Sequence, residues 1–208
     1  INLKSVDDVM NNSGDINIDY TYDGPAIALG GGDDTLTNDG LIDVGTSEYA
    51  GISFGSDDAD GSDDTLVNNG TINIGYTCSA GISMSDGSDL LDNSKGSTIT
   101  INKTDATAIS MGDGDDELTN AGTITVNNSN CSGISLGSGD DNLTNSGTIT
   151  LTNANEADIA LASGDDTLTN EEGATISIGY ADTSFAMGAG DDTLDNSGTI
   201  DINCTNYA

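Results

Sequence analysis

A short motif recurs eight times along this chain of 208 residues, at intervals of 25 to 30 residues. In each copy an Asp stands two places before a large apolar anchor residue, and an Asn stands two places after it. The anchors are Met10, Leu36, Leu66, Leu91, Leu118, Leu143, Leu168 and Leu194. A repeat of this length is typical of a solenoid, in which each coil can bury its apolar face only against neighbouring coils.

Each coil contains two stretches of alternating apolar and polar residues. One precedes the anchor, as in Ile134-Ser135-Leu136, and the other follows it, as in Thr123-Ile124-Thr125-Val126. Such alternation predicts half-buried strands, and no stretch shows helical periodicity. Strands that repeat once per coil stack on their own equivalents and form parallel ladders. We therefore expect an all-β parallel β-helix (β-solenoid) of eight coils of about 26 residues, three-sided and right-handed.

The alternation also predicts which side chains face inward. In one coil these are Ile27 and Leu29, the anchor Leu36, and Ile42 and Val44. The Asn after each anchor shares its parity, so the amides should stack as a hydrogen-bonded ladder, because an unpartnered buried amide costs about 1–3 kcal/mol. These residues are Asn12, Asn38, Asn68, Asn93, Asn120, Asn145, Asn170 and Asn196. Extra residues at 95–96, at 172–173 and around 56–60 are expected at corners.

The composition excludes several classes of function. The formal charge is −33, with 36 acidic residues against three lysines and no histidine. Such a surface repels nucleic acid and anionic membranes and attracts cations. Enzymes that cleave acidic polysaccharides need Arg or Lys to stabilise developing charge, and a catalytic carboxylate pair would be one departure from the repeat rather than part of every coil. We expect no catalytic activity and no membrane insertion.

Paired acids precede the anchors and are the candidate metal ligands. Stacked in register they would lie about 5 Å apart, where like charges repel by about 3 kcal/mol per pair, so the row should need cations. Calcium, with six to eight oxygen ligands, suits a Gly-rich corner better than magnesium. The candidate ligands are Asp33, Asp34, Asp63, Asp64, Asp89, Asp115, Asp116, Asp140, Asp141, Asp165, Asp166, Asp191 and Asp192. The alternative is a solvated turn whose acids only keep the rod soluble.

Around these acids the chain resembles the repeats-in-toxin calcium nonapeptide GGxGxDxUx. The stretch from Gly188 to Leu194 supplies its second, fourth, sixth and eighth positions, as do the stretches from Gly112 to Leu118 and from Gly137 to Leu143. The resemblance implies a calcium-ligand role for Asp34, Asp116, Asp141, Asp166 and Asp192. Here the motif comes once per coil rather than every nine residues, which implies at most one row of ions.

The whole repeat, GxGDDTLTNxGTIxI, also resembles β-helical passenger regions of bacterial autotransporters and surface adhesins. That resemblance implies a secreted stalk or fibre at the cell surface, with a host or neighbouring cell surface as a possible partner.

The chain begins and ends at equivalent points of the repeat, which predicts one solenoid domain over residues 1–208 without capping elements. Open ends expose unpaired backbone and core, so we expect head-to-tail stacking of copies into an extracellular filament or surface layer, or else a fragment of a longer solenoid. An adhesin stalk is the second hypothesis. An ice-binding face is a third, because outward Thr pairs recur at Thr98 and Thr100 and in later coils. Cys78, Cys131 and Cys204 lie too far apart for a bridge within the chain.

Overall fold

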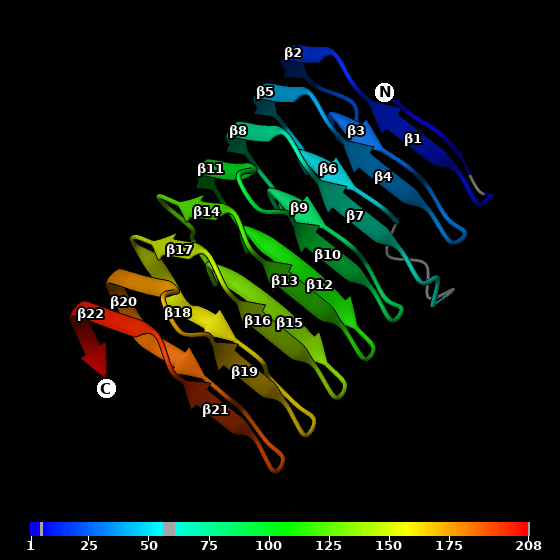
Figure 1. Cartoon of the computed structure of the whole chain (residues 1–208). Helices are drawn as coiled ribbons and strands as arrows, with labels where there is room; N and C mark the ends of the chain where they lie inside the picture. The colour runs from blue at the N-terminus through cyan, green and yellow to red at the C-terminus, as the bar shows by residue number, and fades with distance from the viewer. Residues whose placement is uncertain (5, 56–60, 208) are drawn as a thin grey trace.

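A computed structural model describes residues 1–4, 6–55 and 61–207 of the chain. The fold is a stack of parallel windings. The side chains of residues 181 and 204–207 lie outside what it describes, as does the predicted insertion around 56–60. Figure 1 shows the windings following one another from the N-terminal to the C-terminal end, each lying beside the next. The described residues contain no helix, and therefore none long and apolar enough to cross a membrane.

Three strands per winding form three parallel ladders, which we name by their order in the coil. The opening ladder precedes the aspartates: β3(Ile27–Ala28), β6(Ile52–Ser53), β9(Ile82–Ser83), β12(Ile109–Asp113), β15(Ile134–Ser138), β18(Ala154–Ala160) and the end of β20(Thr175–Ala186). The anchor ladder holds the apolar anchors: β1(Val9–Asn12), β4(Thr35–Asn38), β7(Thr65–Asn68), β10(Leu90–Asn93), β13(Glu117–Asn120), β16(Asn142–Asn145), β19(Thr167–Asn170) and β21(Thr193–Asn196). The closing ladder completes the coil: β2(Asp15–Thr21), β5(Leu41–Ser47), β8(Thr71–Thr77), β11(Thr98–Thr104), β14(Thr123–Val126), β17(Thr148–Leu151), the start of β20 and β22(Thr199–Tyr207).

The register is the one that the repeat predicts. Met10 pairs with Leu36, Leu36 with Leu66, and so on through the eight-stranded anchor ladder to Leu194. Eight passes through this ladder enclose about seven full turns of about 26 residues. The parallel β-solenoid is therefore confirmed, together with its three-sided cross-section and its coil length.

One continuous apolar core runs along the axis. The predicted inward residues Ile27, Leu29, Leu36, Ile42 and Val44 are all fully buried, and their equivalents in the following coils extend the same cluster. The core contains no tryptophan and only one fully buried phenylalanine, so branched aliphatic side chains supply its bulk. Aliphatic columns of one residue type pack well here because each side chain meets its own equivalent one coil away.

The predicted asparagine ladder is present at the corner between the anchor and closing ladders. Each Asn Nδ2 donates to the Oδ1 of the Asn in the following coil at 2.7–2.9 Å, from Asn12 through to Asn196. The same Nδ2 atoms also donate to backbone carbonyls of the following coil, for example from Asn120 to Thr148 at 3.1 Å. The buried amides are thereby satisfied, and the corner has a fixed register.

Candidate functional site

The aspartate corner joins the opening ladder to the anchor ladder, and its glycines are required by the stacking itself. Gly112 and Gly114 have φ of 122° and 137°, a region that side chains disfavour. A Cβ at Gly112 would lie 1.3 Å from the carbonyl oxygen of Ser85 in the preceding coil, and one at Gly114 would lie 1.9 Å from that of Gly87. The Gly-x-Gly pattern that resembles a calcium motif therefore has a sufficient steric cause.

The second Asp of each pair forms an inner row that faces the core. Asp34, Asp64, Asp89, Asp116, Asp141 and Asp166 are 1–2% exposed. Each inner Asp amide donates to the Oδ1 of the inner Asp in the following coil, at 2.7–3.2 Å, along the whole row from Asp8 to Asp192. This burial follows from parity, because these residues stand two places before the inward anchor. The parity that predicts the inward asparagines therefore holds for these aspartates as well, a consequence that the prediction of metal ligands did not take into account.

The remaining carboxylate oxygens of the inner row explain its electrostatics. The Oδ2 atoms of Asp34, Asp89, Asp116, Asp141 and Asp166 are buried without a hydrogen-bond partner. Burial raises the pKa of Asp89 to about 8, of Asp116 to about 7 and of Asp141 to about 6, while the hydrogen bond from the preceding coil opposes the rise and neighbouring carboxylates add to it. The pKa values of the other two are also raised by burial.

The first Asp of each pair forms an outer row with the opposite polarity. The amides of Asp33, Asp63, Ser88, Asp140, Asp165 and Asp191 each donate to the outer Asp Oδ1 of the preceding coil, at 2.8–3.2 Å. All the outer carboxylates are exposed. The two successive amides of each pair thus point in opposite directions along the axis. A doubled Asp gives two charge-assisted ladders from one corner.

The corner brings all thirteen predicted ligands together, but in two rows rather than one. Among the described residues, no group of three or more acidic or cysteine side chains converges on a single point. A cation here would need backbone carbonyls and water in addition to the carboxylates. The unpartnered inner Oδ2 atoms are the feature that fits such a group, and a proton on each carboxyl satisfies the same requirement.

A third polar column, which the sequence analysis did not identify, lies at the corner between the closing ladder and the next opening strand. Ser47, Thr77, Thr104 and Ser129 are buried there, and their hydroxyls cap the turn. The Thr104 hydroxyl, for example, lies 2.9 Å from the carbonyl oxygens of Ser79 and Ala106. One coil beyond Ser129 the position is taken by Ala154, where the column stops.

Asp158 is a departure from the repeat close to the point where the hydroxyl column stops. Its equivalents are glycine or alanine: Ala26, Gly51, Gly81, Ala108 and Gly133. Asp158 is fully buried with both carboxylate oxygens unpartnered, and burial alone raises its pKa to about 7. Ser184 occupies the same position one coil later, and its buried hydroxyl also has no partner. The break in this column of small residues was the sequence signal that could have revealed Asp158.

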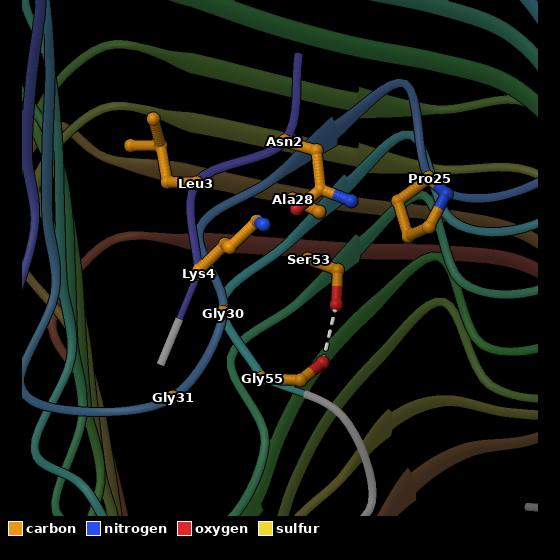
Figure 2. Close-up of a pocket in the computed structure, with 9 residues that line it drawn as sticks. All are labelled: Asn2, Leu3, Lys4, Pro25, Ala28, Gly30, Gly31, Ser53 and Gly55. Atoms are coloured by element: carbon orange, nitrogen blue, oxygen red, sulfur yellow. Dashed lines mark hydrogen bonds between the residues drawn. The ribbon is translucent and has the colours of Figure 1, made fainter. Parts of the chain in front are cut away.

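A groove of about 410 Å³ lies at the N-terminal end of the opening ladder (Figure 2). Asn2 and Lys4 line one side and Pro25 and Ser53 the other, and the Ser53 hydroxyl donates to the Gly55 carbonyl at 2.6 Å. The described residues that line the groove include no acidic side chain to act as a general base.

Two of the three cysteines have free thiols, Cys78 and Cys131. The side chain of Cys204 lies outside the described residues.

The fold and its corners define a repetitive parallel β-solenoid. A sequence profile of the family described as BigA fourth domain matches residues 90–207, which is more than half of the chain. The chain therefore belongs to this family, which is bacterial and surface adhesin-like. Neither the curated proteins nor the solved structures give a significant match. The family confirms the expected likeness to bacterial adhesins, while the calcium nonapeptide stays a prediction.

Proposed function

We propose that this protein is a structural segment of a bacterial surface adhesin-like passenger, a rigid stalk exposed at the cell surface. The observation that carries the proposal is the unbroken register of the anchor ladder through eight passes, in a chain of an adhesin-like family. The aspartate and asparagine ladders at two of the corners fix that register along the axis, which suits a spacer better than a flexible linker. The role is non-catalytic in this proposal.

Labelling of intact producing cells tests the location. Antibodies raised against the purified chain should label intact cells as strongly as permeabilised cells. Labelling that requires permeabilisation would contradict surface exposure.

Head-to-tail assembly is the second candidate function, and the two end coils favour it. Leu194 and Ile202 belong to the core columns of the last coil and are 47% and 46% exposed, while Ile1 in the first coil is 50% exposed. Exposed strand edges and exposed core favour continuation of the ladder. In this proposal the end coil of a second copy covers that surface and builds a filament.

Electron microscopy of the purified chain distinguishes a filament of stacked copies from a monomeric stalk. Filaments with a helical repeat support assembly of copies, whereas isolated rods at all protein concentrations support a monomeric stalk. A variant with charge in the end surface, Leu194→Lys, should abolish filaments and leave the circular dichroism spectrum unchanged. Filaments that persist in this variant would contradict stacking through the end coil.

Calcium remains part of the proposal, with the aspartate corner as the place of binding. The inner Oδ2 atoms without partners and the exposed outer carboxylates support it. A bound cation would supply the positive charge that offsets repulsion along the two rows. Thermal unfolding with excess calcium and with a chelator tests this, because a ligand of the native state raises the midpoint. Equal midpoints would exclude a calcium site, and protons would then be the groups that neutralise the inner row.

A further inference from the structure

Four successive coils place chemically distinct side chains in one outward column near the end of the closing strands. In register, Tyr20 of β2 pairs with Thr46 of β5, Thr46 with Tyr76 of β8, and Tyr76 with Lys103 of β11. The column therefore contains two tyrosines. One coil after Tyr20 the column holds Thr46, and one coil after Tyr76 it holds Lys103.

Tyr76, which is followed one coil later by Lys103, forms a complete cation–π site within the chain. The Nζ of Lys103 lies 5.2 Å from the centroid of the Tyr76 ring, within the range of a cation–π interaction. The Tyr76 hydroxyl donates to Oδ2 of Asp105 at 2.5 Å. Asp105 stands two residues after Lys103, so the same coil supplies the cation and the carboxylate that holds the ring.

The other tyrosine repeats this arrangement without the cation. The Tyr20 hydroxyl donates to Oε1 of Glu48 at 2.7 Å, and Glu48 stands two residues after Thr46. Ring and carboxylate thus have the same relation in register as Tyr76 and Asp105. Thr46 occupies the position of the lysine and carries no charge. Tyr20 is 52% exposed, so its surface is accessible from solvent.

Further aromatic and acidic groups surround the Tyr20 copy. A groove of about 250 Å³ is lined by Tyr22, Asp23, Glu48 and Tyr49. Tyr22 and Tyr49 are 70% and 49% exposed, so both rings present apolar surface to solvent. Glu48 borders the groove and also holds Tyr20, so it joins the two surfaces. The formal charge of −33 draws cations toward the whole molecule.

We propose that the cluster of Tyr20, Tyr22, Asp23, Glu48 and Tyr49 binds an organic cation of the alkylammonium type. The cation lies against the Tyr20 ring as Lys103 lies against Tyr76, with Glu48 as its counter-ion. A lysine side chain of a partner protein and a free alkylammonium compound present the same chemistry. The inference goes beyond the stalk proposal and depends on neither calcium nor filament assembly.

The test is a titration followed by nuclear magnetic resonance of ring-labelled tyrosine, which gives six residues to follow. The probes are n-butylammonium chloride and an acetylated tetralysine peptide, with sodium chloride at matched ionic strength as the control. The Tyr20, Tyr22 and Tyr49 signals should shift and saturate with a Kd of about 1 mM or below for one of the probes. Saturation by butylammonium supports a free-compound site, whereas saturation by the peptide alone supports a partner protein.

Two exchanges of residues within the column make the test specific. Thr46→Lys places an internal ammonium group over Tyr20, and it should weaken binding at least about tenfold, about 1.4 kcal/mol. Lys103→Thr uncovers the second ring, and it should make the Tyr76 signal respond to the probes. Thr150→Lys adds the same charge elsewhere on the closing ladder and should leave binding unchanged. Shifts that sodium chloride reproduces, or that survive Thr46→Lys undiminished, would overturn the proposal.

Discussion

Replacement of Asp158 by alanine should stabilise the protein, and more at alkaline than at acidic pH. Asp158 is fully buried with neither carboxylate oxygen partnered, in a column where the five preceding coils have glycine or alanine. Burial raises its pKa from 3.8 to about 7. A carboxyl with a raised folded-state pKa lowers stability as pH rises above the unfolded value, and the loss is complete above the folded value.

The magnitude follows from the size of this shift. A rise of about three pKa units is worth about 4 kcal/mol, because each unit corresponds to about 1.4 kcal/mol. At pH 8 the whole of this penalty is present. At pH 5, only about one unit above the unfolded value, about 1–2 kcal/mol of it is present. The gain in unfolding free energy from Asp158→Ala should therefore be larger by about 2–3 kcal/mol at pH 8 than at pH 5.

Urea unfolding of both proteins at the two pH values measures this difference. Comparison of the gains at each pH cancels the titration of the other carboxyls that the two proteins share. Ala108→Asp places a carboxyl at the equivalent position two coils away, just before β12. It should lower stability with the same pH dependence. Asp43→Ala, at an exposed position on β5, should have little effect. An equal gain at both pH values would refute the view that Asp158 is buried as a charge-bearing group.

Other predictions concern the corners. Gly112→Ala should lower the free energy of unfolding by more than about 3 kcal/mol, because its Cβ would overlap the Ser85 carbonyl. Gly96→Ala, with open space around it, should cost only about 1 kcal/mol. Urea unfolding measures both. Asn120→Ala should cost about 2–4 kcal/mol by the same measurement, since it breaks the amide ladder in both directions, while the outward Thr119→Ala should change stability by less than about 1 kcal/mol. Equal costs within either pair would contradict the steric or the ladder argument.

The repetition explains why so much of the fold could be predicted. A residue such as Leu118 meets its own equivalents Leu91 and Leu143, so the register follows directly from the sequence intervals. The same holds for the inward amide of Asn120, which the parity rule places correctly. Long-range contacts, which usually defeat sequence reasoning, are here fixed by the period of the repeat.

The chemistry of the site was harder to predict, because it depends on departures from the repeat and on backbone direction. The split of each Asp pair into a buried and an exposed row arises from two successive amides that point in opposite directions, as at Asp140 and Asp141. The residue types do not indicate in which direction along the axis each amide points. Asp158 departs from the repeat, and the Tyr20–Glu48 arrangement recurs at Tyr76–Asp105 but not in every coil, so the repeat pattern does not reveal them.

In-register stacking of the coils is tested most directly by engineered disulfides on the outer face of the anchor ladder. Thr119 and Thr144 pair in register, so their Cα atoms should lie about 4.8 Å apart, within the range of a disulfide. Thr119 and Thr169 are two coils apart, at about 9.6 Å. In a background with the native cysteines replaced by serine, mild oxidation should cross-link the 119/144 cysteine pair and leave the 119/169 pair reduced. Cross-linking of the distant pair as readily as the near one, or of neither pair, would contradict the stacked solenoid.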